Sequence, residues 1–142
     1  MGVMRNGRWV SKNPPNIAGR FDRMASNFTE DVLREELQEN PKRFDLYVSH
    51  ACPWAHRTMI FRKFKGLESC IKVHVVDATM GDQGWSFSRA EPNIGAKYLR
   101  ELYAKTPKYT GRVTVPVLWD KQTSSIRNNE SADIIRMMNH LW

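Results

Sequence analysis

Cysteine is scarce in this sequence, because only Cys52 and Cys70 occur among its 142 residues. Two cysteines are too few for the disulfide framework of a small secreted domain, so we expect reduced thiols and a cytoplasmic location. Long apolar runs are missing too. None approaches the roughly 18 residues of a membrane-spanning helix, and the first residues lack the apolar core of a signal peptide. We therefore expect no membrane partner.

Runs of one charge are also absent, although the chain is basic. Its 22 Lys and Arg residues exceed its 15 Asp and Glu residues, for a formal net charge of +7. The densest basic group has helical spacing, which is typical of a solvated helix face: Arg57, Arg62, Lys63 and Lys65. We expect no nucleic-acid partner, whereas small anionic substrates would suit this diffuse positive field.

Two regions differ in their composition. Residues 1–42 hold Asn, Gly, Pro and Ser around one helical candidate, residues 29–40, for which Thr29 is the expected N-cap. We interpret this region as an N-terminal extension that lies on a core formed by other residues. Residues 43–142 alternate between strand and helix patterns, and we interpret them as one α/β domain.

The order of elements in that domain is predicted to be βαβαββα. A βαβ opening implies a parallel strand pair, and the short turn "DKQTSS" implies an antiparallel hairpin. A mixed four-stranded sheet satisfies both, so the sequence predicts a thioredoxin-like fold. The predicted strands are 44–49, 71–77, 114–120 and 124–129. The predicted helices run from Pro53 to Gly66, over 96–105 and from about Glu130. On the first helix, four apolar residues are expected to share a face: Ala55, Met59, Ile60 and Phe64.

Cys52 stands directly before a predicted helix. There the helix dipole and unpaired backbone N–H groups stabilise a thiolate, and nearby Arg57 is expected to favour the anion. Pro53 suits the first helical turn because its missing N–H is not needed there. A thiolate is the nucleophile in thiol exchange, so Cys52 is the candidate catalytic residue. The alternative is a buried, inert cysteine.

No second cysteine stands close enough to resolve a disulfide on Cys52. Ala55 occupies the position of the second cysteine in a C-x-x-C motif, so a mixed disulfide would wait for an external thiol, and glutathione is the abundant cytosolic candidate. Cys70 is interpreted as a core residue. His50 and His56 flank Cys52, but these three ligands are one short of a closed zinc site, so we expect no metal.

Two further features suit an extended peptide such as glutathione. If the Val115–Pro116 bond is cis, Val115 would turn its backbone N–H and C=O toward Cys52, with Pro116 at the start of a strand. Glu130 and Ser131 stand at a predicted helix N-terminus, where N–H groups bind a carboxylate and Glu130 can pair with an ammonium. A γ-glutamyl group carries both charges on one carbon. A plain helix cap is the alternative.

Several motifs together resemble the Xi-class glutathione transferases, the glutathionyl-hydroquinone reductases: "YVSHACPWAHRTMI", "GWSF" and "RVTVPVLWDKQTSSIRNNESADIIRMMN". The resemblance implies that Cys52 attacks the sulfur of a glutathionyl-hydroquinone, releases the hydroquinone and keeps glutathione as a mixed disulfide. A second glutathione then regenerates the thiolate and leaves as glutathione disulfide.

The resemblance also implies a role for individual residues. Trp85 would pack on glutathione, Arg112 would contact its glycyl carboxylate, and Val115 would pair with its cysteinyl backbone. Glu130 and Ser131 would hold the γ-glutamyl group.

Members of the family continue past the helix that starts at about Glu130 into a helical domain, which supplies the quinone pocket and dimer contacts. We therefore expect such a domain or a second copy as a partner, poor quinone reduction by this chain alone, and uncovered apolar surface at Met138, Leu141 and Trp142.

Three functions are open from the sequence. The first is a glutathione-dependent enzyme that acts on glutathionyl-quinols. The second is a glutathione-binding or protein-interaction module without turnover. The third, a basic nucleic-acid-binding module, is disfavoured because the charge is diffuse and no binding motif occurs.

Overall fold

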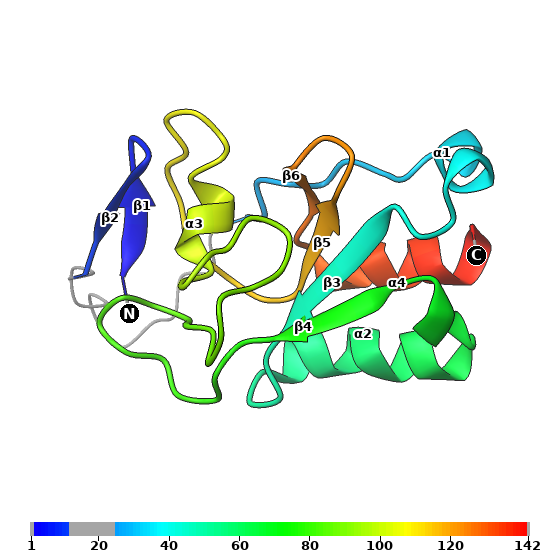
Figure 1. Cartoon of the computed structure of the whole chain (residues 1–142), viewed down its shortest axis with the longest axis horizontal. Helices are drawn as coiled ribbons and strands as arrows, with labels where there is room; N and C mark the ends of the chain where they lie inside the picture. The colour runs from blue at the N-terminus through cyan, green and yellow to red at the C-terminus, as the bar shows by residue number, and fades with distance from the viewer. Residues whose placement is uncertain (1, 12–24, 142) are drawn as a thin grey trace.

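The computed structural model describes residues 2–11 and 25–141 (Figure 1). A hairpin of β1 (Val3–Arg5) and β2 (Arg8–Val10) comes first, followed by the short helix α1 (Arg34–Glu39). From residue 44 onward the predicted βαβαββα order is confirmed. These elements are β3 (Phe44–Val48), α2 (Pro53–Phe64), β4 (Lys72–Val75), α3 (Arg100–Tyr103), β5 (Val117–Asp120), β6 (Ser125–Asn128) and α4 (Ser131–His140), with a 3-10 turn at Leu67–Ser69 after α2.

The central sheet has four strands in the order β4-β3-β5-β6. Strand β3 runs parallel to β4 and antiparallel to β5, and β5 pairs with β6 as an antiparallel hairpin. This is the mixed sheet that the pattern predicted. Helices α2 and α4 lie side by side against the sheet, and the short α3 lies next to β6 (Figure 1). The arrangement is thioredoxin-like.

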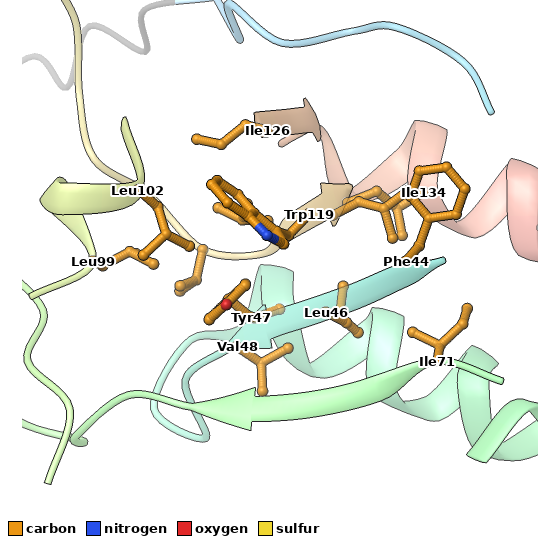
Figure 2. Packing of buried hydrophobic residues seen from close by; sticks show 14 of the residues in the cluster. Phe44, Leu46, Tyr47, Val48, Ile71, Leu99, Leu102, Trp119, Ile126 and Ile134 are labelled. Carbon is orange, nitrogen blue, oxygen red and sulfur yellow. The ribbon is translucent and has the colours of Figure 1, made fainter. Parts of the chain in front are cut away.

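The core lies on both faces of the sheet, because every residue of β3 is buried. Figure 2 shows Trp119 of β5 near the middle of the cluster, with Leu99 and Leu102 to one side and Phe44 and Ile134 to the other. The exposed fraction of all five side chains is 0%. Helix α3 covers only residues 100–103 of the predicted helix 96–105, but it still turns Leu102 into the core next to Leu99.

A buried polar network fixes the long loop between β4 and α3 to the sheet. The Tyr47 hydroxyl on β3 donates to the Glu91 carboxylate at 2.6 Å, and the same carboxylate accepts the backbone N–H groups of Asn93 and Ile94. Burial raises the pKa of Glu91, but these hydrogen bonds outweigh it and hold the pKa below its ordinary value. Glu91 is therefore an anionic anchor for the loop.

A second buried network joins α1 to the edge of the sheet. The Asp120 carboxylate accepts hydrogen bonds from Arg43 at 2.9 and 2.6 Å and from Arg127 at 2.9 Å. Both guanidinium groups also pair with Glu36 of α1, at 2.9 and 2.6 Å. Two cations thus face two carboxylates, and the buried charges compensate one another.

The predicted cap of the first helix is wrong. Thr29 forms an isolated antiparallel bridge with Asn128, so its backbone extends the sheet at β6 instead of opening a helix. Helix α1 begins five residues later, with Leu33 as its N-cap and the Glu36 carboxylate accepting the Leu33 N–H at 2.8 Å. The extension still packs on the domain, since Met4, Val32 and Leu37 join the buried cluster. Residues 12–24 of the extension lie outside the described residues.

The expected apolar face of α2 is also partly wrong. Ala55 is buried, but the side chains of Ile60 and Phe64 are 55% and 83% exposed. Helix α2 instead turns Ala55 and Thr58 inward. The buried Thr58 hydroxyl has a hydrogen-bond partner, because it donates to the Ala55 carbonyl at 2.6 Å. A small hydroxyl residue fits where α2 packs closely on its neighbours.

The expected exposure at the end of α4 is not found for Met138, whose exposed fraction is 0%. Met138 packs inward together with Ile134, one turn earlier on the same face of α4. Leu141 is half-buried, and Trp142 lies outside the described residues.

Candidate functional site

Cys52 is the N-cap residue of α2 and ends the short turn that connects β3 to this helix. Its backbone N–H donates to the Ser49 carbonyl at 3.1 Å, and its own carbonyl accepts the N–H of His56 at 2.9 Å. Pro53 occupies the first helical turn, as expected. The half-buried thiol therefore stands at the positive end of a 12-residue helix.

The Val115–Pro116 peptide bond is cis, which is the condition that the sequence left open. It lies in the segment leading into β5 and brings the Val115 carbonyl oxygen to 3.6 Å from Cys52 Sγ. A backbone edge thus runs beside the thiol, although the two residues are 63 positions apart in the sequence.

Most of the predicted site residues meet at one open pocket. Those that line it are Cys52, Trp85, Arg112, Val115, Pro116 and Ser131. They come from the start of α2, the loop after β4, the segment before β5 and the start of α4. Pro53 and Glu130 are not among the lining residues.

Glu130 lies directly beside the pocket as the N-cap of α4, and its carboxylate accepts the Ala132 N–H at 3.4 Å. Glu130 therefore does cap α4, as the alternative interpretation of the sequence expected. The same carboxylate accepts a hydrogen bond from the hydroxyl of Ser26 at 2.9 Å, and its side chain stays 24% exposed. Glu130 is therefore partly exposed to solvent next to Ser131, which lines the pocket.

Arg57 of α2 contacts the start of α4 beside the pocket. Its guanidinium donates to the Ser131 hydroxyl, lies 3.7 Å from the Glu130 carboxylate and stacks over the ring of Trp54 at 5.1 Å. The expected support of the Cys52 anion by Arg57 stays a prediction. Sequence reasoning placed Arg57 on a basic helix face and missed its contacts with α4.

Asn129, Tyr109 and Thr114 line the pocket, and hydrogen bonds hold all three residues in place. The Asn129 amide donates to the Tyr103 hydroxyl at 3.2 Å, and that hydroxyl donates to the Thr114 carbonyl at 2.8 Å. The Tyr109 hydroxyl donates to the Arg112 carbonyl at 2.7 Å. Burial raises the pKa of Tyr103 and of Tyr109, so both remain neutral hydrogen-bond donors.

Several lining residues were not predicted from the sequence. Ser26 and Asn27 come from the extension, and Trp54, Met80, Tyr109 and Asn129 come from the domain. Trp54 and Asn129 adjoin predicted residues, so proximity in sequence was an available signal for them. Nothing local marks the extension residues, because they reach the pocket only through tertiary contacts.

Across residues 2–11 and 25–141, no group of three or more His, Cys, Asp or Glu side chains is arranged to hold a metal ion, and His50 and His56 are exposed. Within the same described part of the chain, no helix combines the length and apolar character needed to cross a membrane.

Comparison with known proteins adds a family context. Residues 51–141 match the family described as glutathione S-transferase, N-terminal domain. A glutathione S-transferase omega-like 2 from Schizosaccharomyces pombe is 50% identical over 139 residues, which cover 92% of this chain and 43% of that protein. Glutathionyl-hydroquinone reductase PcpF from Sphingobium chlorophenolicum is 43% identical over 147 residues, which cover 98% and 47%. The chain thus spans about half the length of the curated relatives it matches.

Solved structures give the same context. A Xi-class glutathione transferase from Natrialba magadii superimposes with a TM-score of 0.88 at 40% identity, covering 99% of this chain and 47% of that one. The glutathione-bound structure of YqjG from Escherichia coli K-12 superimposes with a TM-score of 0.66 at 52% identity, covering 70% and 34%.

Proposed function

Because the chain belongs to the glutathione S-transferase family through its N-terminal domain, and is similar to the Xi class within it, we propose that it carries out glutathione-dependent thiol chemistry at Cys52. One observation supports this most strongly. The Cys52 thiol lines a pocket at the start of α2 and faces the backbone of Val115 at 3.6 Å. This chemistry consumes reduced glutathione, which the cytoplasm supplies.

The proposed reaction is the reduction of a glutathionyl-hydroquinone in two steps. The Cys52 thiolate attacks the glutathione sulfur, an S–S bond forms and the bond from that sulfur to the aromatic carbon breaks. The electron pair stays on the ring carbon, which takes up a proton, and the hydroquinone leaves. A second glutathione thiolate then attacks the mixed disulfide, so that glutathione disulfide leaves and the Cys52 thiolate returns.

The residues around the pocket would divide the binding of glutathione among them. Val115 would pair with the cysteinyl backbone and hold the sulfur at Cys52. Glu130 and Ser131, at the N-terminus of α4, would hold the γ-glutamyl ammonium and carboxylate.

Trp85 would pack on glutathione, and Arg112 would bind its glycyl end. Pro53 and Pro116 would shape the backbone around Cys52. No metal takes part in this scheme.

The hydroquinone side of the reaction would need more than the described pocket. The curated relatives are about twice as long as this chain, and we propose that a helical domain or a second copy supplies the quinone contacts. The glutathione site itself would lie within this domain. Without the partner, the chain would bind glutathione and turn over glutathionyl-hydroquinones slowly.

The test is intact-mass analysis after incubation with oxidised glutathione. The unmodified chain and Cys70→Ser should each gain one glutathione and lose it to excess reduced glutathione, whereas Cys52→Ser should gain none. An adduct that persists in Cys52→Ser would refute the assignment. Turnover of a glutathionyl-hydroquinone then separates the enzyme from a binding or interaction module, which would form the adduct without releasing hydroquinone.

A further inference from the structure

The N-terminal hairpin holds one wall of the pocket through its first strand. The backbone N–H of Met4 in β1 donates to the Gly111 carbonyl at 2.8 Å, and the Gly111 N–H donates back at 3.0 Å. Gly7, in the turn, donates to the Tyr109 carbonyl at 2.9 Å. Met4 is 2% exposed, so the contact is part of the core. The segment that it holds leads directly into Arg112 of the pocket.

The second strand of the same hairpin holds another wall. The Trp9 indole N–H donates to the Asp82 carbonyl at 3.0 Å, and its ring lies against Gly84. A Cβ atom on Gly84 would lie 3.0 and 3.2 Å from ring atoms of Trp9, and the φ of Gly84 is +81°. Both the close approach and the left-handed backbone require glycine here. Gly84 directly precedes Trp85.

The loop that Trp9 contacts has few other attachments at its tip. Gly84 bonds to Gly81 within the turn itself, while the Trp85 carbonyl accepts the Leu99 N–H at 2.9 Å on the far side. Glu91 anchors the loop further along. The Arg100 guanidinium of α3 also donates to the Gln83 carbonyl at 3.2 Å and lies over the Trp9 ring. Among the contacts of the described residues, Trp9 and Arg100 together therefore join the tip of this turn to the rest of the domain.

We propose that Trp9 is a positioning residue that sets the glutathione pocket. One rigid hairpin holds the loop of Met80 and Trp85 on one side and the segment of Tyr109 and Arg112 on the other. It therefore fixes the separation of two walls that are distant in sequence. A pocket held in its binding geometry before the ligand arrives binds more tightly, because no loop has to be ordered on binding. This inference rests on glutathione as the ligand of the pocket.

The test compares glutathione affinity with thiol reactivity in Trp9→Ala. We expect the Kd for glutathione, measured by calorimetry, to rise about 3- to 10-fold, as loss of pre-organisation predicts. The rate at which iodoacetamide alkylates Cys52 should stay unchanged, because the contacts of Trp9 with other described residues do not include α2 or the thiol. Trp9→Phe keeps the ring over Gly84 and should restore part of the affinity. Phe64→Ala, at an exposed aromatic on α2, is the matched control and should change neither quantity.

A double-mutant cycle distinguishes positioning from a general loss of stability. If Trp9 acts through the loop of Trp85, then Trp9→Ala should add little to the loss of affinity already caused by Trp85→Ala. Fully additive losses would overturn the inference.

Amide hydrogen exchange provides a readout that does not depend on glutathione. Exchange at residues 81–86 should be faster in Trp9→Ala and less affected in Trp9→Phe, so the milder variant still tests the contact if the alanine variant folds poorly. Unchanged amide exchange at residues 81–86 in Trp9→Ala would show that Trp9 does not hold this loop in place. Failure of the unmodified chain to bind glutathione would overturn the proposed function, whereas equal binding by the unmodified chain and Trp9→Ala would overturn only this inference.

Discussion

The guanidinium of Arg57 donates two hydrogen bonds to the hydroxyl of Ser131, from Nε at 3.0 Å and from Nη2 at 2.5 Å. Arg57 lies one turn into the helix that begins after Cys52, and Ser131 is the first residue of α4. The contact therefore ties together the two helix N-termini that border the pocket. It holds the proposed γ-glutamyl site at a fixed position relative to the thiol.

Replacing Arg57 should weaken glutathione binding. Arg57→Ala removes the hydrogen bonds to Ser131 and the guanidinium 3.7 Å from the Glu130 carboxylate, so we expect the Kd to rise about tenfold, as for the loss of a charge-assisted hydrogen bond. Arg57→Lys should recover little, because an ammonium lacks the two-donor fork. Calorimetric titration of both variants measures this, and an unchanged Kd in Arg57→Ala would contradict it.

Variants of Glu130 should separate its cap from its proposed ligand contact. Glu130→Gln keeps an oxygen that can accept the Ala132 N–H but loses the charge, so it should bind glutathione more weakly and unfold at nearly the same temperature. Glu130→Ala should in addition lose about 1 kcal/mol of stability, which is typical for an N-cap. Ser131→Ala should also weaken binding. If all three variants bind as the unmodified chain does, Glu130 and Ser131 serve the helix alone.

A second cysteine on the first turn of α2 should change the products at Cys52. Ala55→Cys places a thiol three residues after Cys52, the spacing at which dithiol oxidoreductases close a local disulfide. After incubation with oxidised glutathione, this variant should release the bound glutathione and retain an intramolecular disulfide. Mass analysis distinguishes the two forms. Ala55 is fully buried, so the larger side chain should also lower stability by about 1–3 kcal/mol.

The Asp120 network predicts a stability that depends on pH. Burial raises the pKa of Asp120, but the hydrogen bonds from Arg43 and Arg127 outweigh it and hold the pKa well below its ordinary value. A lowered pKa in the folded state stabilises the fold above the unfolded-state value of about 3.9, and this stabilisation is lost as the pH falls below it. Asp120→Asn should therefore destabilise the chain at pH 7 by about 3 kcal/mol.

Denaturant unfolding at several pH values measures this effect. The difference in unfolding free energy between the unmodified chain and Asp120→Asn should shrink below about pH 4, where the unfolded-state carboxyl becomes protonated. Asp133→Asn, at an ion pair on the surface of α4, is a suitable control and should change stability little. A difference that stays constant down to pH 2 would show that charge on Asp120 is not the cause.

Local patterns in the sequence determined most of the secondary structure and the location of the candidate nucleophile. Alternating apolar residues marked β3 and β4, the short polar turn marked the hairpin of β5 and β6, and Pro53 marked the start of α2 after Cys52. Glu130 was recognised as the start of α4 in the same way. These features depend on residues within a few positions of one another, so the chain carries their signals locally.

Only the tertiary structure decided which residues complete the pocket and which face of each helix is buried. Arg57 turns toward α4 because Ser131 and Glu130 lie there, and Ile60 and Phe64 are exposed because α2 packs through Ala55 and Thr58 instead. Trp9 reaches Asp82 across 73 residues and Ser26 reaches Glu130 across 104. Contacts between residues so far apart in the sequence leave no local pattern, because they depend on how separate elements pack rather than on the spacing of residues within one element.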